Sequence, residues 1–505
     1  MTERIEMLKR FQWDKRHHVY RRAAEENVER AWRDPALSDA MRTAIRLKCA
    51  LDAETPVLLP GELIAFTRTV PNLPRQFSDE EWAEVCAGHT IHELGNVSNL
   101  SPDYASVMRK GLIAIRDSLT DGGEHAAMRL SIDAVLSLTA RYAAYAQSQG
   151  DAALADVLDR VPACPPRTFR EALQSLRILH FAMWAEGDYH NTLGRFDQYM
   201  FPYLQRDLAA GTETEDSAFE LLEAFFLSCN RDSDLYPGMQ QGDNGQSIVL
   251  GGMTPDGRDA TNPLTYLILR SKKEFPFQYP DVSLRVHANT PDKLLRAAAE
   301  VVKVGYGCPK FFNDEEFITH YIAAGVPLHI ARDYAACGCC GGRLPDYETY
   351  LAAVCNLNIT AVLEMAMSDG WVHFGDGKYE KFLDTPIPAG QIQNMDDLMV
   401  NLEAAFTFFV RHIMKRTGTL EQSNALKLAC PFTSALSEAG RINMKDLHQP
   451  CDRDYGLYID NGAVNVIGIG TLIESLSALD EFVFRGREFT LEQVRQAVNA
   501  NFEGY

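Results

Sequence analysis

The centre of this sequence is the stretch Ala331-Arg-Asp-Tyr-Ala-Ala-Cys337-Gly-Cys339-Cys340-Gly-Gly342, in which three cysteines and three glycines fill the last six positions. Glycines allow a tight backbone turn and a close approach to a ligand. A thiol on such a loop can be presented at the tip instead of being packed as a small apolar side chain. The alternative is a glycine-rich turn that holds buried structural thiols. The rest of the chain is needed to choose between these interpretations.

The composition is that of a globular protein with an acidic surface. Of the 505 residues, 46% are apolar and 23% are charged, and the formal net charge is -20. We therefore expect no nucleic-acid partner and no anionic membrane partner. No stretch approaches 18 uninterrupted apolar residues, so we expect no transmembrane helix.

The number and spacing of the cysteines indicate whether the protein functions in an oxidising or a reducing compartment. There are 11 of them, an odd number, scattered along the chain around the central cluster. This is not a disulfide framework, and the N-terminus has no secretory signal, so we predict reduced thiols and a cytoplasmic protein. No Cys-x-x-Cys pair or histidine-rich tract completes a metal site for the cluster, so we predict no bound metal.

Residues 1–165 are predicted to be mainly helical. Apolar residues recur at three- and four-residue spacing over 38–51 and 124–146, without glycine or proline. After a proline-rich break, Thr168 is predicted to cap a helix that has Glu171 at its third position and runs through Ala182.

Residues 166–505 alternate short strands, loops and helices. The run 247–250 has the length and β-branching of a buried strand, and 281–287 alternates in the manner of a strand. Thr290 followed by Pro291 predicts the start of a helix. Another helix is expected over about 350–367, and Thr490 with Gln493 predicts a capping box for the last helix. This alternation of short strands, loops and helices predicts an α/β barrel with its reactive loops inside.

Several long motifs, in the same order, resemble the glycyl radical enzymes related to pyruvate formate-lyase and glycerol dehydratase. Besides the cysteine stretch they are Pro166-Arg-Thr-Phe-Arg-Glu-Ala-Leu-Gln174, Gly194-Arg-Phe-Asp-Gln-Tyr-Met-Phe-Pro-Tyr203, Leu250-Gly-Gly-Met-Thr-Pro-Asp-Gly-Arg-Asp-Ala-Thr-Asn262, Gly307-Cys-Pro-Lys-Phe-Phe-Asn-Asp314 and Asn501-Phe-Glu-Gly504. The resemblance covers nearly the whole chain, so we treat residues 1–505 as one pyruvate formate-lyase-like barrel domain.

The resemblance implies a barrel of ten strands, built as two five-stranded parallel halves and surrounded by helices. In this family a cysteine loop and a loop with a glycyl radical meet inside the barrel. The cysteine becomes a thiyl radical that takes a hydrogen atom from the substrate and later returns it. Cys339 matches that cysteine, within a loop that we place at 337–342. A radical S-adenosylmethionine activating enzyme installs the glycyl radical, and no cofactor is bound permanently.

Two departures from the family pattern affect the expected chemistry. The dehydratases and eliminating lyases have Gly-Cys-x-Glu, but here Gly341 stands where their glutamate base would be. The adjacent pair Cys339 and Cys340 is instead similar to that of pyruvate formate-lyase, in which two cysteines share acyl transfer. The chain also ends before the family's glycyl radical domain, which we therefore expect to be absent. The radical would come from a separate subunit or a missing C-terminus, and we expect homo- or hetero-oligomers.

Candidate substrate contacts also follow from the resemblance. In the dehydratase relatives, the loop before the Gly-Arg-x-Asp-Gln motif contacts the substrate, and here that loop holds Asp188, Tyr189 and His190. Asp188 or His190 could replace the missing base. Ser247 is a further candidate, as is Arg285, which is expected to share one face of a barrel strand with His287.

We therefore predict a glycyl-radical-type enzyme that uses Cys339 to cleave a C–X or C–C bond of a small polar organic substrate. One alternative is a catalytically inactive barrel that binds a ligand or serves a structural role. The other is acyl transfer through Cys339 and Cys340, as in a formate acetyltransferase.

Overall fold

A computed structural model describes most of the chain: residues 1–22, 31–70, 77–88, 96–97, 100–189, 191–232, 246–276, 279–337, 341–374, 378–424, 429–447 and 459–505. Its contacts divide the chain into two compact units. Unit 1 comprises Met1–Leu351 and Gln422–Asn461, and unit 2 comprises Ala352–Glu421 and Gly462–Tyr505. Each unit is described by itself.

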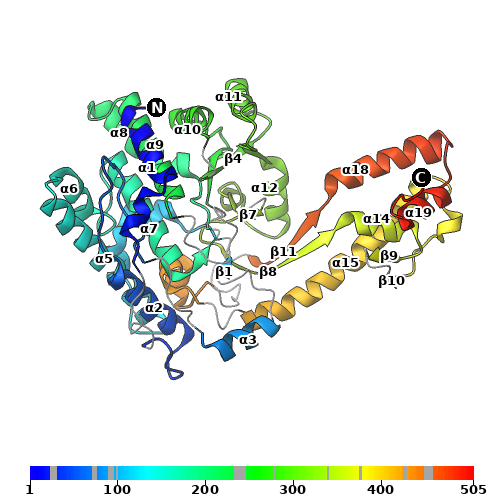
Figure 1. The fold of residues 1–505 in the computed structure, drawn as a ribbon, viewed down its shortest axis with the longest axis horizontal. Coiled ribbons are helices and arrows are strands. Elements are labelled where there is room, and N and C mark those ends of the chain that lie inside the picture. The colour runs from blue at the N-terminus through cyan, green and yellow to red at the C-terminus, as the bar shows by residue number, and fades with distance from the viewer. Residues whose placement is uncertain are drawn as a thin grey trace. The chain divides into compact units, whose positions relative to one another are not determined.

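The first part of unit 1 is helical, as predicted. Its helices are α1 (Glu3–Trp13), η1 (Arg16–Tyr20), α2 (Asp39–Ala53), α3 (Asp79–Gly88), α4 (Tyr104–Asp117), α5 (His125–Ser148), α6 (Ala152–Arg160), α7 (Phe169–Glu186), α8 (Phe196–Ala210) and α9 (Glu215–Asn230). The helices predicted over 38–51 and 124–146 are confirmed as α2 and α5 (Figure 1).

Helix α7 begins where the capping signal predicted and ends later. Thr168 Oγ1 accepts a hydrogen bond from the Glu171 backbone N–H at 3.1 Å, which confirms the cap. The Glu171 carboxylate accepts from the Arg167 N–H at 2.5 Å. Nearly every side chain of α7 is buried, so this helix lies in the interior of unit 1.

The main sheet of unit 1 is parallel and consists of β3 (Ser247–Gly251), β4 (Asp281–Val286) and β5 (Lys310–Asn313). All five residues of β3 are buried, which confirms the buried strand expected there. The strands are followed by α10 (Pro263–Glu274), α11 (Asp292–Val302) and α12 (Asp314–Ala323), and this order forms two βαβ units (Figure 1). The number of ten barrel strands remains a prediction.

Unit 1 is completed by shorter elements. A two-stranded parallel ladder joins β1 (Asn96–Val97) to β2 (Asp188–Tyr189). The remaining elements are α13 (Leu328–Ala331), β6 (Ala335–Cys337), β7 (Gly341–Arg343), α16 (Pro431–Ala435) and α17 (Glu438–Asn443).

Two predicted helix starts were wrong. Thr290 does not cap α11, because its hydroxyl accepts from the His287 N–H and Pro291 occupies the cap position. The helix expected over about 350–367 forms only in its second half. Residues Glu348–Asn358 form strand β8, and the Asn358 side chain then caps α14 (Ile359–Met367) by accepting from the backbone of Thr360 and Ala361.

Unit 2 has its own apolar core. Strand β8, which belongs to unit 2 from Ala352 on, pairs with β11 (Ile459–Ile467), which belongs to unit 2 from Gly462 on. Strand β9 (Trp371–Phe374) pairs antiparallel with β10 (Lys378–Lys381). The helices are α14, η4 (Ala389–Gln391), α15 (Met395–Asn424), α18 (Ile469–Ala478), η6 (Leu479–Arg485) and α19 (Leu491–Asn499). The capping box of Thr490 and Gln493 at the start of α19 is confirmed.

Candidate active site

The cysteine stretch forms a β-hairpin, which we call the cysteine hairpin. Strand β6 pairs antiparallel with β7, so that Ala335 lies opposite Arg343 and Cys337 lies opposite Gly341. Residues 338–340, which connect the two strands in the sequence, lie outside the described residues, and Cys339 and Cys340 are among them. Cys337 itself is buried, with its thiol 3.6 Å from the Leu100 carbonyl oxygen.

Ser247 connects the main sheet to the cysteine hairpin. Its hydroxyl lies 3.0 Å from Thr192 Oγ1 and 3.2 Å from the Ala336 carbonyl oxygen. The serine is buried at the start of β3. It therefore contacts the strand that leads into Cys339, and its predicted contact with substrate remains a prediction.

Arg285, on β4, forms the centre of a fully buried cluster that we call the arginine clamp, made of Arg285, Asp314 and Tyr334. Arg285 Nε and Nη2 donate to the two carboxylate oxygens of Asp314 at 2.7 and 2.9 Å. The Tyr334 hydroxyl donates to the same carboxylate at 2.9 Å, and the guanidinium carbon lies 3.9 Å from the Tyr334 ring centroid. Bidentate pairing of this kind holds a guanidinium in one orientation.

The clamp also holds the backbone that precedes the cysteine hairpin. Arg285 donates to the carbonyl oxygens of Tyr334 at 2.7 Å and Arg332 at 2.8 Å. All three guanidinium nitrogens thus bind protein acceptors, which favours a positioning role for this predicted substrate contact. Gly252 makes the arrangement possible, because its φ is +75° and a Cβ there would lie 2.6 Å from Arg285 Nε.

A second arginine, Arg195, joins the same region from the start of α8. Its terminal nitrogens donate to Asp333 at 2.8 Å and to the Gly251 carbonyl at 3.0 Å. Asp197 accepts from the Gly251 N–H at 2.9 Å and from the Thr265 hydroxyl at 2.6 Å, so both residues hold the scaffold at the end of β3.

Asp188 is fully buried in β2, where it lies opposite Asn96. Burial raises the pKa of Tyr104 far above its usual value, and the nearby Cys337 and Asp188 raise it further. The Tyr104 phenol therefore lies within electrostatic reach of both the cysteine hairpin and Asp188. The side chain of Tyr189, and the whole of His190, lie outside the described residues.

Sequence reasoning missed Glu186, the last residue of α7. Its carboxyl oxygens accept from the Phe432 N–H at 2.7 Å and the Thr433 N–H at 3.0 Å. Burial raises the pKa of Glu186 to about 8, the two backbone hydrogen bonds oppose this, and Asp188 and Asp446 add to it. An acidic residue at the C-terminal end of an apolar helix is unfavourable for the helix dipole, and that was the available signal.

Several buried polar atoms adjoin Asp188, Asn191 and Thr192, which we call the polar segment. Among the described residues, no hydrogen-bond partner is found for His180 Nε2, Asn191 Oδ1, Ser101 Oγ and Tyr104 Oη. Burial, together with the charge of Arg177, lowers the pKa of His180 to about 3, although a hydrogen bond to the Asn191 backbone opposes the shift.

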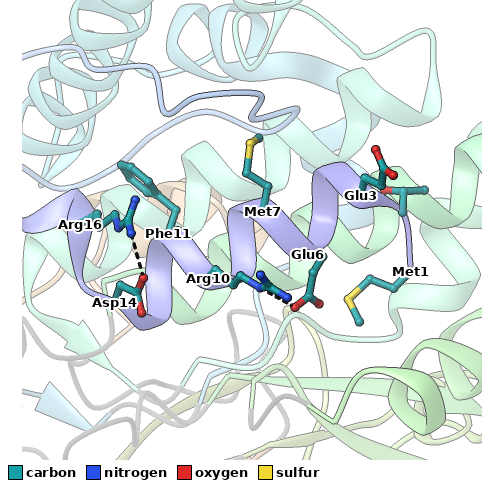
Figure 2. Close-up of a pocket in the computed structure, with 9 residues that line it drawn as sticks. Met1, Glu3, Glu6, Met7, Arg10, Phe11, Asp14 and Arg16 are labelled. Atoms are coloured by element: carbon teal, nitrogen blue, oxygen red, sulfur yellow. Dashed lines mark hydrogen bonds and ion pairs between the residues drawn. The ribbon is translucent and has the colours of Figure 1, made fainter.

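A separate pocket runs along one face of α1 (Figure 2). It is lined by Met1, Thr2, Glu3, Glu6, Met7, Arg10, Phe11, Asp14 and Arg16. Its charges pair locally, Arg10 with Glu6 at 3.0 Å and Arg16 with Asp14 at 3.4 Å. Such surface pairs are solvated, and no cysteine lines the pocket, so we assign it no part in the chemistry.

The described residues contain no group of three histidines, cysteines, aspartates or glutamates arranged to hold a metal ion. Within the same residues, no helix is both long and apolar enough to cross a membrane.

Comparison with known proteins identifies the family of this chain. The model of the family "Pyruvate formate lyase-like" matches residues 76–505. Isethionate sulfite-lyase of Bilophila wadsworthia is 34% identical over 365 residues, which are 70% of this chain and 43% of that protein. Trans-4-hydroxy-L-proline dehydratase of Clostridioides difficile is 26% identical over 446 residues, which are 83% of this chain and 54% of that protein. The chain thus spans about half the length of these relatives.

Solved structures show the same fold. Hydroxyproline dehydratase from Clostridioides difficile with its substrate bound matches with a TM-score of 0.82 at 20% identity, covering 100% of this chain and 74% of that structure. Glycerol dehydratase from Clostridium butyricum matches with a TM-score of 0.79 at 20% identity, covering 99% and 74%. The fold is therefore the α/β barrel of the glycyl radical enzymes. The chain belongs to the pyruvate formate lyase-like family, as its motifs predicted.

Proposed function

We propose that this chain is the catalytic barrel portion of a glycyl radical enzyme that acts on a small polar organic molecule through Cys339. The observation that supports this most directly is the anchoring of the cysteine hairpin. Ser247 holds β6, the arginine clamp holds the backbone before it, and buried polar groups lie beside Cys337. A residue whose reacting atom must meet a substrate needs such a preorganised support.

In the proposed reaction, the sulfur of Cys339 takes a hydrogen atom from a C–H bond of the substrate. An S–H bond forms, and a carbon radical remains on the substrate. The neighbouring C–X or C–C bond then breaks, and the product radical takes the hydrogen atom back from sulfur. The glycyl radical, supplied by another chain or a further segment and installed by a radical S-adenosylmethionine activating enzyme, provides the initial one-electron oxidation of the thiol.

If X is a hydroxyl group, loss of water needs a base that removes a proton from the substrate radical and an acid that protonates the leaving oxygen, and Gly341 cannot serve as the base. We propose that Asp188 takes the proton as this base and that Glu186 donates a proton to the leaving oxygen. Glu186 retains a proton near neutral pH, and its carboxyl group lies close enough to Asp188 for their charges to interact. A carboxyl group that holds a proton near the working pH is suited to act as a general acid.

One observation favours a second candidate. Cys339 is followed directly by Cys340, and the carboxylate expected for elimination is replaced by Gly341. Acyl transfer between two adjacent thiols would need both cysteines and no carboxylate at this position. Loss of Cys340 therefore separates the two functions, because elimination needs only Cys339.

The test is anaerobic electron paramagnetic resonance followed by a turnover assay. The chain would be mixed with a polypeptide that carries the glycyl motif, the activating enzyme, S-adenosylmethionine and a reductant. We expect a glycyl doublet and product formation that Cys339→Ala abolishes and Cys340→Ala leaves intact. Loss of turnover in both variants would support acyl transfer. A doublet without turnover on any dehydratase or lyase substrate would support an inactive ligand-binding barrel.

A further inference from the structure

The exit of the cysteine hairpin, like its entry, is held by specific contacts. Strand β7 packs against α12 at Gly342, where a Cβ would lie 2.8 Å from a Phe317 ring carbon and 2.9 Å from the Tyr321 hydroxyl. The next residue, Arg343, is buried and lies 3.8 Å from the carboxylate of Glu348, which is also buried. The backbone that leaves the hairpin therefore has little freedom beside α12.

Asp346, the third residue after β7, has an unusual backbone conformation. Its φ is +72°, in the left-handed region that glycine favours and other residues seldom adopt. Such a conformation costs free energy and persists where the surrounding contacts hold it. Here the Asp346 carboxylate accepts hydrogen bonds from the Ser437 hydroxyl and, at 3.2 Å, from the Ala439 N–H. Both donors lie at the start of α17, 91 and 93 residues further along the chain.

Helix α17 is itself attached to the helical part of unit 1. His125 Nε2, at the start of α5, donates to the Arg441 carbonyl oxygen at 2.7 Å. Lys110, on α4, donates to the Glu438 carboxylate at 3.2 Å, and the Arg441 guanidinium donates to the Ala435 carbonyl oxygen of α16 at 2.7 Å. A side chain that binds α17 therefore connects the hairpin to α4, α5 and α16.

The surroundings of the Asp346 carboxyl make this attachment sensitive to pH. Burial raises the pKa of Asp346 to about 6 and Asp103, at the start of α4, also raises it, whereas the hydrogen bonds from α17 and the charge of Arg441 lower it. Glu438 lies 3.9 Å from Arg441 and offsets part of that charge. The attached carboxyl therefore binds more protons than a solvated aspartate, whose pKa is 3.8, so the attachment weakens as the pH rises from 3.8 to 6.

We propose that Asp346 is a positioning residue that attaches the exit of the cysteine hairpin to α17, so that the hairpin is held at both ends. The arginine clamp provides the attachment at the entry, through the carbonyl oxygens of Tyr334 and Arg332. The residues that connect β6 to β7 include Cys339. This inference rests on the function proposed above, because a thiol that must meet a substrate benefits from a hairpin fixed on both sides.

Amide hydrogen exchange, measured by mass spectrometry on the full chain without activation, tests the proposal. Asp346→Gly removes the carboxyl group and relieves the left-handed backbone, so any loss of protection comes from the lost contacts with α17. We expect exchange in peptides that cover β6 and β7 to become faster by at least about tenfold, the size expected when hydrogen bonds to a carboxyl group are lost. Strand β4 should stay protected. Asp346→Asn keeps an oxygen acceptor and should restore the protection of the hairpin.

Asp369, in unit 2, provides the matched control. Its φ is +52°, and its carboxylate accepts from the Ala389 N–H at 2.6 Å, so it shares both features of Asp346. Asp369→Gly should leave exchange in β6 and β7 unchanged, because its partner lies in η4 of unit 2.

A pH series gives a second readout that a purely structural role would not change. After correction for the intrinsic exchange rate, the protection of β6 and β7 should fall between about pH 4 and 6, by at most about tenfold per pH unit. Asp346→Asn cannot ionise at this position, so the fall should be smaller in that variant.

Unchanged exchange of β6 and β7 in Asp346→Gly overturns the proposal. Equal loss of protection in β4 also overturns it, since the whole chain would then be destabilised. If that variant does not fold, the same pH dependence in the unsubstituted chain and in Asp346→Asn overturns it instead. Because exchange needs no radical, faster exchange without Cys339-dependent turnover would leave the attachment standing and remove the proposed function. Turnover with unchanged exchange would do the reverse.

Discussion

Unit 1 and unit 2 bury very different side chains. Unit 1 encloses several ion pairs between fully buried or nearly buried groups: Arg285 with Asp314, Arg177 with Asp232, Arg231 with Glu62, and Arg68 with Glu54. In unit 2, the buried polar side chains among the described residues are Ser368 and Asn401. The core of unit 2 is otherwise apolar, built from residues such as Leu363, Leu398 and Leu472.

The difference supports the proposal that the chemistry takes place in unit 1. Removing charges from water costs free energy, and well-packed apolar side chains often stabilise a fold equally well. A core that needed only stability would therefore resemble that of unit 2. In unit 1, the buried charges hold defined backbone segments, such as the one before the cysteine hairpin, and the reaction that we propose at Cys339 would require such support.

Replacing Cys339 is expected to have the largest effect on activity, and it tests whether the chemistry depends on unit 1. Cys339→Ala should abolish turnover in the activated system while leaving the melting temperature within about 1 °C, because the change removes one sulfur atom and no backbone bond. Cys355→Ala, a cysteine in the range of unit 2, is the matched control and should retain activity. Full activity of Cys339→Ala would show that unit 1 does not use this cysteine.

Breaking the arginine clamp should have the largest effect on stability. Arg285→Met leaves the Asp314 carboxylate buried without its bidentate partner, and we expect a loss of about 3–5 kcal/mol in the free energy of unfolding. Urea denaturation measures this loss. The double variant Arg285→Met with Asp314→Leu should be more stable than the single one, since no charge is left unpaired. Equal destabilisation in both would argue against the clamp as a coupled pair.

The corresponding test in unit 2 is Asn401, which binds only backbone. Its amide donates to the carbonyl oxygens of Ala366 at 3.0 Å and Ile387 at 2.7 Å, and accepts from the Ile387 N–H at 2.9 Å. Asn401→Leu leaves these groups unpaired, so we expect a loss of about 2–3 kcal/mol. The alkylation rate of Cys339 by iodoacetamide should not change. If that rate rose, the two units would be energetically coupled.

The raised pKa of Glu186, in unit 1, predicts that the stability of the folded chain depends on pH. Its pKa is about 8 in the folded chain, above the value of 4.5 for an ordinary glutamate, so the folded state binds more protons between these values. Its contribution to stability is complete below about pH 4.5 and is lost as the pH rises through 8, at up to about 1.4 kcal/mol per pH unit. Glu186→Gln should therefore flatten the fall in stability between pH 6 and 8.

In Glu186→Gln, the free energy of unfolding should still fall with rising pH, because Glu62 is also buried and its pKa is raised to about 7. Urea denaturation at three pH values measures the change in slope. The same substitution at Glu403 in unit 2, Glu403→Gln, is the control and should leave the slope as it is. An unchanged slope in Glu186→Gln would mean that Glu186 is ionised throughout this range.

Much of the fold could be predicted because its signals are local. Thr168 and Thr490 cap their helices through atoms three residues away, and the apolar run at β3 is a buried strand. The prediction was wrong where local signals conflict. Residues 350–358 carry helix-compatible spacing, yet they pair as a strand with β11, a partner about a hundred residues later in the chain.

The sequence by itself determined the family and several helix caps, because motifs and capping signals consist of residues that are close together in the chain. Only the tertiary structure decided that Arg285 binds the backbone before the cysteine hairpin, and that burial raises the pKa of Glu186. The partners of these groups are remote in the chain: Asp314 lies 29 residues from Arg285, and Phe432 lies 246 residues from Glu186. The protonation of a carboxyl group depends on burial and on neighbouring charges, and both exist only once the chain has folded.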